Sequence, residues 1–468
     1  TARQIDSQFS LFEQLATLSD HVIVLCPNLN LLNCIAKKRG GQNLYAELAY
    51  SPDRHILKFA RDKNLPVVAT NRIFFCQPKD WEIHLLLSAI RKNTTVHSVP
   101  PKEIISSNGY MKSPEQMIHI FRHAPDAISN TLVIAEQCNV KLPVGTVNFP
   151  PFVSPGKETH SSHLRRLSRA GIARLYPESI PKEVKQRLNY ELKIINDLNF
   201  TTYFLIVWDI VREAQARGIP SIGRGSAANS LVCRALNITE VDPIRHNLYF
   251  ERFLNPERTD YPDIDIDFPW NRRDEIFDYV FKKYGRDHVA LISSHIHFRS
   301  RSALREVGKA LGVSEREINR FTALLPHSIK LSQLDEARQI IPECHNLPLE
   351  DVPYRAMVSL ARRIEGFPRH VSVHCSGIVI SPFPITDRIP LQKTQKGLVV
   401  TQYDMYPIED MGLLKVDLLA QKGLAVLADT VAAIEARKST RIDFNRIDPT
   451  QDEKTRKLIW HGNTIGCF

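Results

Sequence analysis

Residues 261–268 alternate acidic and apolar side chains more strictly than any other stretch of the chain, as Asp263, Asp265 and Asp267 are separated by isoleucines. This alternation predicts a half-buried β-strand with all three carboxylates on one face. Because aspartate is disfavoured in strands and like charges repel, the pattern favours a site for hard divalent cations, which prefer oxygen ligands. The alternative is a solvated edge strand whose charges deter aggregation.

A second apolar run, residues 412–419, carries Lys415 and Asp417 two positions apart, so the two side chains share one strand face. A lone acid in an apolar strand is unfavourable unless it meets a cation. Asp417 is therefore the candidate third carboxylate of the acidic site.

Small residues from 223 to 230 lead into a helical pattern over 230–236. Such a turn predicts that backbone amides at a helix N-terminus are available to an anion. Arg224, Gly225 and Ser226 can add charge, close backbone approach and hydrogen bonds. The alternative is a tight turn with close helix packing.

Arg252 and Arg258 bracket a turn between this loop and the acidic strand. They can contact phosphates, or they can form surface ion pairs with Glu251 and Glu257.

The chain of 468 residues is too long for one core and predicts two to four domains. Its net charge of +10 favours a polyanionic partner. Basic residues gather at 157–174 and on successive turns of one predicted helix, where Arg301, Arg305 and Lys309 form a ridge suited to a nucleic-acid backbone. A solvated basic face is the alternative.

Eight scattered cysteines without a C-x-x-C pair predict reduced thiols in a cytoplasmic protein. No apolar run approaches the length of a membrane span.

The hydrophobic pattern also predicts the remaining elements. Strands are expected at 21–26, 65–70, 288–293 and 376–381, and helices at 11–18, 46–63, 81–90, 181–195, 203–216 and 273–283. Residues 295–365 and those from 424 onward are expected to be mostly helical. Alternating strands and helices in residues 1–142 predict an α/β unit with a parallel sheet, and the proline-rich residues 143–160 predict a domain boundary.

Four motifs in order carry a family resemblance: Gly223-Arg-Gly-Ser226, the run from Phe250 to Arg258, Pro262-Asp-Ile-Asp-Ile-Asp-Phe268 and Gly412-Leu-Leu-Lys-Val-Asp417. Together they resemble the alpha subunit of bacterial DNA polymerase III, a C-family polymerase. The resemblance implies a multidomain α/β and α+β fold. Its expected parts are a PHP-type α/β barrel fragment (1–142), a polymerase beta-like nucleotidyltransferase palm (143–294 and 373–422), a helical thumb insert (295–372) and the start of the fingers (423–468).

The resemblance also implies the site. Asp263, Asp265 and Asp417 match the catalytic, metal-binding triad, which would hold two Mg²⁺ ions, and Asp267 matches an acid outside the three. The residues that look like nucleotide contacts are Arg224, Gly225, Ser226, Arg252, Arg258 and Lys415. Two metal ions about 4 Å apart suit the addition of a nucleotide to a primer 3′ end.

The implied function is template-dependent DNA synthesis from deoxynucleoside triphosphates on primed DNA. The sliding clamp and other replisome subunits are expected to bind regions that this sequence lacks, and the chain alone is expected to be inactive. Two alternatives are a non-catalytic nucleic-acid-binding scaffold and a metal-dependent phosphoesterase in the PHP segment.

Two departures from the family pattern qualify these expectations. Arg72 and Phe74 stand where metal-binding PHP domains carry Asp and His ligands, so PHP nuclease activity is not expected and His84 is interpreted as structural. Residues 415–420 look more like the error-prone branch than the replicative one.

Overall fold

The structure is a computed structural model and describes residues 10–11, 13–14, 20–145, 148–156, 158–255, 257, 262–326, 329–439, 442 and 449–465. The chain divides into two compact units, one formed by residues 143–294 and 371–468 and the other by residues 6–142 and 295–370. The predicted helix at 11–18 lies largely outside the described residues.

The first unit contains most of a mixed seven-stranded sheet of order β4-β5-β10-β7-β6-β9-β8. Strand β5 is antiparallel to β4 and parallel to β10, and β10 is antiparallel to β7. The strand bounds are β4 Ile222–Arg224, β5 Asp265–Pro269, β6 Val289–His297, β7 Pro368–Ile380, β8 Leu391–Lys393, β9 Val399–Thr401 and β10 Leu414–Gln421.

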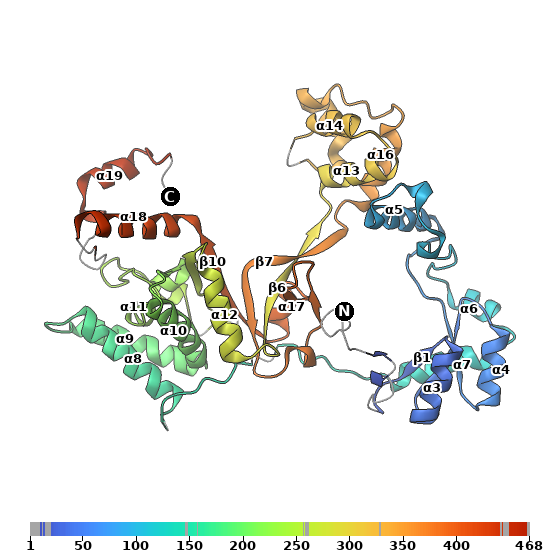
Figure 1. Cartoon of the computed structure of the whole chain (residues 1–468), viewed down its shortest axis with the longest axis horizontal. Coiled ribbons are helices and arrows are strands. Elements are labelled where there is room, and N and C mark those ends of the chain that lie inside the picture. The colour runs from blue at the N-terminus through green and yellow to red at the C-terminus, as the bar shows by residue number, and fades with distance from the viewer. Residues whose placement is uncertain are drawn as a thin grey trace. The chain divides into compact units, whose positions relative to one another are not determined.

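The helices between residues 160 and 284 pack on the apolar side of β5 and β10. Ile264, Ile266 and Leu418 are fully buried in one core with the helices, because alternation sends every second side chain of these strands to the helical side. Figure 1 shows α8 to α11 gathered as one group. The helix bounds are α8 His160–Leu175, α9 Lys182–Asp197, α10 Thr201–Ala216, α11 Leu231–Ala235, α12 Arg273–Tyr284, α17 Met405–Asp410, α18 Lys422–Lys438 and α19 Glu453–Trp460.

The second unit contains a parallel sheet of order β1-β2-β3, as the alternation in residues 1–142 predicts. Apolar residues of these strands share one core with the flanking helices, including Phe121 and Ala127. The bounds are β1 Val24–Cys26, β2 Leu44–Ala49, β3 Val67–Thr70, α3 Leu29–Arg39, α4 Arg54–Asp62, α6 Pro114–Ile120 and α7 Pro125–Gln137.

A further core in the second unit joins two segments that are far apart in sequence. Ile83, Leu86 and Ala89 pack with Leu304 and Met357. Figure 1 shows the helices that carry them, α5, α13 and α16, close together. The helical segment 295–370 therefore shares its core with α5. The bounds are α5 Trp81–Lys92, α13 Ser300–Ala310, α14 Glu315–Ala323, α15 Leu334–Ile340 and α16 Tyr354–Ile364.

The predicted helix over 46–63 is wrong in its first part. Residues Leu44–Ala49 form β2, whose Leu44, Ala46 and Leu48 are fully buried between β1 and β3. Burial in a central strand outweighs the helix propensity of these residues. Helix α4 begins only at Arg54, after Asp53 accepts hydrogen bonds from the His55 and Ile56 amides at 2.8 and 3.2 Å.

Among the described residues, no single helix has both the length and the apolar composition to cross a membrane. The bent pair α9 and α10 passes this test on length and composition alone.

Candidate active site

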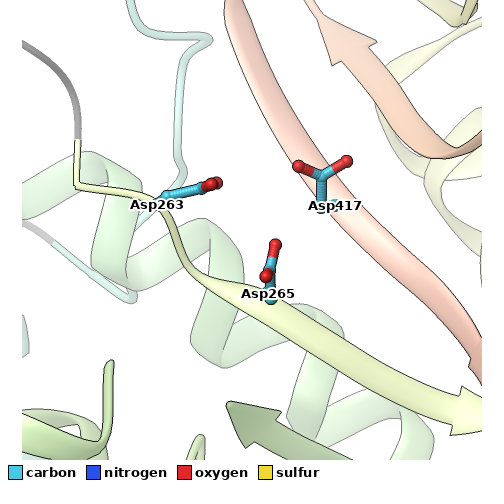
Figure 2. A group of neighbouring side chains, drawn as sticks. All are labelled: Asp263, Asp265 and Asp417. Carbon is cyan, nitrogen blue, oxygen red and sulfur yellow. The ribbon is translucent and has the colours of Figure 1, made fainter. Parts of the chain in front are cut away.

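The structure brings Asp263, Asp265 and Asp417 together, with one carboxylate oxygen from each lying within 4.8 Å of the others. Asp265 and Asp417 are register partners in the parallel pair β5–β10, and Asp263 precedes β5 by two residues. Figure 2 shows the three carboxylates turned toward a common space from these two segments. Asp263 is exposed, Asp265 half-buried and Asp417 buried, so the cluster opens to solvent on the Asp263 side.

The cluster concentrates negative charge. Burial raises the pKa of Asp265, and the charges of Asp263 and Asp417 raise it further. A site that makes a carboxyl harder to ionise is one where a cation is strongly favoured.

Lys415 supplies positive charge inside the cluster. Its Nζ lies 3.0 Å from Asp417 Oδ2, 3.5 Å from Glu409 Oε1 and 4.0 Å from Asp263 Oδ1. Burial alone would lower the pKa of Lys415, but the carboxylates of Asp417 and Asp263 outweigh it and raise the pKa above its usual range. Lys415 is therefore held as a cation at the acidic face.

Asp267 lies on the same strand face but beside a different cation. Its Oδ1 lies 3.5 Å from Arg224 Nε and accepts a hydrogen bond from Gln421 Nε2 at 3.4 Å. Burial raises the pKa of Asp267 and Arg224 partly opposes this. The structure thus separates Asp267 from the group of three, although Arg224 also lies 3.6 Å from Asp265.

The glycine-rich loop reaches the cluster through its backbone and Ser226. Gly225 has φ +69°, a conformation that glycine adopts most readily, and opens the 3-10 helix Gly225–Asn229. Ser226 Oγ donates to the Asp263 carbonyl at 3.5 Å. The structure therefore places Ser226 beside the backbone of a triad residue.

Of the two other predicted nucleotide contacts, the structure describes Arg252 alone. Arg252 ends the 3-10 helix Phe250–Arg252 and is exposed. Arg258 lies outside the described residues.

The prediction that the amides of the helix after this loop are available to an anion is wrong. Glu191 of α9 already accepts hydrogen bonds from the Leu231 and Val232 amides, both at 3.0 Å. The first turn of α11 is capped by an acid from within the protein. The signal was present in the sequence, since Glu191 interrupts the apolar stripe of its helix between Leu188 and Ile195.

Ser376 is a site residue that the sequence patterns did not single out. It is 3% exposed, and its Oγ donates to Asp417 Oδ1 at 2.8 Å. The next residue, Gly377, is the register partner of Asp417, and a Cβ there would lie 2.8 Å from Ile292. Strand β7 thus holds one oxygen of Asp417 through Ser376, while the missing side chain of Gly377 leaves room for Ile292 of β6.

Only part of the predicted basic ridge on α13 is exposed to solvent. Arg305 and Lys309 are exposed. Arg301 is half-buried and donates to the Leu325 carbonyl within the same unit. The exposed basic pair on this helix is Arg305 and Lys309.

The acidic cluster fits divalent metal ions. Three carboxylates from two strands present hard oxygen donors within reach of one another, which is the ligand chemistry of Mg²⁺ and related ions. Across the described part of the chain, no other group of histidine, cysteine or acidic side chains meets this geometric test.

Arg72 and His84, in residues 1–142, both contact other groups of the same unit. Arg72 lies 3.5 Å from the buried Glu47, which also accepts from Thr70 Oγ1 at 2.7 Å. His84 Nε2 accepts from the Ile105 amide at 3.3 Å, and burial lowers the pKa of His84. Both contacts are those of structural residues.

Residues 162–420, more than half of the chain, match the family described as the bacterial DNA polymerase III alpha NTPase domain. All three clustered carboxylates and every predicted nucleotide contact lie within this range.

Relatives are similar over most of the chain. The DNA polymerase III subunit alpha of Bacillus subtilis is 39% identical over 414 residues, covering 88% of this chain and 37% of that protein. An error-prone DNA polymerase of Symbiobacterium thermophilum is 38% identical over 404 residues, covering 86% and 37%. The DNA polymerase III subunit alpha of Thermus aquaticus is 34% identical over 472 residues, covering 88% and 39%.

The chain spans less than two-fifths of the length of these relatives. The similar identities to a subunit alpha and to an error-prone enzyme do not separate the two branches. With the family match over residues 162–420, the motifs and the relatives agree, and the chain belongs to the bacterial DNA polymerase III alpha family.

Proposed function

We propose that this chain carries the nucleotidyl-transfer site of a DNA-directed DNA polymerase, which extends a primer 3′ end from deoxynucleoside triphosphates under the direction of a template. The observation that supports this most is the meeting of Asp265 and Asp417 across β5 and β10 with Asp263 beside them, inside the segment that matches the family. The named relatives are DNA polymerases.

Asp263, Asp265 and Asp417 would hold the metal ions, with Mg²⁺ as the proposed species. When bound, such ions supply positive charge that favours ionisation of the primer hydroxyl and stabilises the leaving oxygen of an in-line displacement. The buried Asp417 fixes one side of the site, since Ser376 and Lys415 hold its two oxygens at 2.8 and 3.0 Å.

The remaining residues bind and orient the triphosphate. Phosphoryl transfer depends mainly on positioning and charge stabilisation, so cations and polar groups around the acidic cluster are what the reaction requires. Arg224, Lys415 and Ser226 surround the cluster in the structure. Gly225 permits close approach of the triphosphate, and Arg252 and Arg258 are proposed to contact its outer phosphates.

The domain roles are part of this proposal. Residues 143–294 and 373–422 would form the palm, 295–372 the thumb, 423–468 the start of the fingers and 1–142 part of a PHP-type barrel. Arg305 and Lys309 would contact the backbone of primed DNA, a location in the cytoplasm suits such a substrate, and the sliding clamp and other replisome subunits are the proposed protein partners.

No observation favours the two alternatives. A phosphoesterase in residues 1–142 would need metal ligands, and the Glu47 carboxylate is paired with Arg72 instead. A scaffold with an inactive site would not need three clustered carboxylates.

The test is primer extension by the full-length gene product that contains these residues, with Asp265→Asn as the inactive variant and Asp278→Asn, an exposed position on α12, as the control. We expect the control to extend primers and the Asp265→Asn variant to bind primed DNA without extending it. Primer extension by the Asp265→Asn variant at the control rate would refute the proposal.

A further inference from the structure

We propose that Arg187 and Glu191 of α9 are positioning residues that set the two proposed nucleotide-binding segments, 225–232 and 248–252, in their places. This inference rests on the proposed function, because the segments matter only if a nucleotide binds there.

Glu191 is the central acceptor of the first segment. It is fully buried, and its carboxylate accepts from Ser230 Oγ at 2.8 Å and from the Leu231 and Val232 amides at 3.0 Å. Ser230 Oγ in turn accepts from the Cys233 amide at 3.1 Å. One side chain thus fixes the start of α11 directly after the loop that carries Ser226.

Arg187 joins this segment to the second one. Its Nε donates to Glu191 at 2.7 Å, and its Nη2 donates at 3.0 Å to the carbonyls of Asn229 and Leu248. Asn229 ends the glycine-rich turn, and Leu248 precedes the 3-10 helix that ends at Arg252. A single guanidinium therefore holds both segments to the same helix.

The contacts continue to the acidic cluster. Asn229 Nδ2 donates to the Ser226 carbonyl at 2.9 Å, and Ser226 Oγ donates to the Asp263 carbonyl at 3.5 Å. A hydrogen-bonded path thus runs from α9 through the loop to the backbone of a triad residue.

A third residue of the same helix face contacts the second segment. Tyr190, three residues after Arg187, donates from its hydroxyl to Glu251 Oε1 at 2.7 Å. The rings of Tyr190 and Phe250 lie 6.2 Å apart in an edge-to-face arrangement. Residues at i and i+3 lie on one side of a helix, so α9 presents a continuous contact face to both segments.

Stability alone is a weak reason for this ion pair, in which Glu191 is fully buried and Arg187 is half-buried. Burying two charges carries a desolvation penalty, and apolar residues of similar volume often give equal stability. The rest of the α9 stripe, Val184, Leu188, Leu192 and Ile195, is apolar and buried. What apolar residues cannot do is accept from two amides and a hydroxyl while donating to two carbonyls, which is the property that fixes backbone position.

The experiment compares Glu191→Gln with Asp209→Asn. Asp209 is a matched control because it is 1% exposed, lies in the same unit and is paired with Arg212 and Lys283, both of which lie outside the two segments. A second variant, Arg187→Met combined with Glu191→Leu, removes the charges without leaving one of them unpaired.

Two measurements are made on the full-length gene product that contains these residues. Hydrogen–deuterium exchange of the peptide covering 225–236 tests the positioning of the backbone. Steady-state primer extension separates KM for the nucleotide from kcat and from the Kd for primed DNA.

We expect Glu191→Gln and the double variant to speed exchange of the 225–236 peptide and to raise KM for the nucleotide about ten- to hundredfold, since small misplacements of binding groups have effects of this size. The Kd for primed DNA should not change, and Asp209→Asn should change neither exchange of this peptide nor KM. Equal KM values for the double variant and Asp209→Asn would overturn the inference. A parent protein that extends no primer would instead overturn the proposed function, and faster exchange in Glu191→Gln would still show that Glu191 fixes this backbone.

Discussion

Asp265 and Asp417 are direct partners in the parallel pairing of β5 with β10, although the whole helical segment from α13 to α16 separates them in sequence. Register partners in a parallel pair of strands point their side chains to the same face of the sheet. The register of this one pair therefore builds the acidic site, and a shift of one residue would send Asp417 to the helical core.

Substitution within the triad should affect activity far more than substitution of its neighbour on the same strand. We expect Asp417→Asn to lower kcat of primer extension roughly 10³-fold or more. The reason is that the three carboxylates would hold the metal ions as one unit, so that loss of any one carboxylate removes most of their effect. Asp267→Asn should retain most activity, since Asp267 contacts Arg224 and Gln421 rather than the three acids of the triad. Steady-state kinetics with both variants checks this, and equal losses would place Asp267 in the reacting group.

Removal of the charge at Asp265 should stabilise the metal-free protein while it abolishes activity. The folded-state pKa of Asp265 is raised above its unfolded value of about 3.9. Between these two pKa values the folded protein retains a proton that the unfolded chain has lost. Stability therefore falls as pH rises from the unfolded pKa through the folded one, and Asp265→Asn lacks this loss. We expect Tm of the variant in EDTA to exceed that of the parent at pH 7.5 by on the order of 2 °C, and the difference to shrink toward pH 4.

Metal ions should reverse the order of Tm, so that the parent becomes more stable than Asp265→Asn. An ion that binds only the folded protein adds about 2.7 kcal/mol at a concentration of 100 Kd. Mg²⁺ should thus raise Tm of the parent and of the exposed control Asp278→Asn, but not of Asp265→Asn. Thermal melts with and without Mg²⁺ are the measurement, and an equal Mg²⁺ effect on all three proteins would contradict the assignment of Asp265 as a ligand.

The local patterns of the sequence locate the acidic site but do not choose its members. Alternation over 261–268 and the Lys-x-Asp run of β10 single out Asp263, Asp265, Asp267 and Asp417, and only the family resemblance sets Asp267 apart. The structure brings the other three together. The family expected from the motifs is confirmed by the match over residues 162–420.

What the sequence did not predict depends on contacts between distant segments. Glu191 caps α11 only because α9 packs against it, and Ser376 reaches Asp417 only because β7 pairs with β10 in one register. Arg301 belongs to a basic helix face by spacing, yet its guanidinium turns to the Leu325 carbonyl. Periodicity predicts which face of a helix or strand a side chain lies on, but not which residue it contacts. The roles of Glu191, Ser376 and Arg301 depend on those contacts.

Ser376 should tune the affinity of the site for metal ions. Its hydroxyl holds one oxygen of Asp417, and loss of such a supporting hydrogen bond lowers metal affinity about 10- to 100-fold in characterised sites. We expect Ser376→Ala to raise the Mg²⁺ concentration needed for half-maximal primer extension by that factor, with kcat recovering at saturating Mg²⁺. Ser381→Ala is the matched control, because Ser381 is buried near the end of the same strand and donates to the Phe383 carbonyl. A normal Mg²⁺ requirement in Ser376→Ala would exclude the supporting role.

Gly171 should be intolerant of a single added methyl group. It lies in α8, where a Cβ would be 2.0 Å from the carbonyl oxygen of Ala235 at the end of α11. Glycine to alanine within a helix usually stabilises a protein, but here the helices must move apart, and overpacking of this kind costs about 1–3 kcal/mol. We expect Gly171→Ala to lower the free energy of unfolding by this amount in urea titrations. Gly41→Ala is the control, since its Cβ would meet only the end of the Leu65 side chain at 3.3 Å. Because α11 directly follows the glycine-rich loop, the same variant should raise KM for the nucleotide, and a Gly171→Ala protein as stable as the control would show that α8 and α11 are not packed this closely.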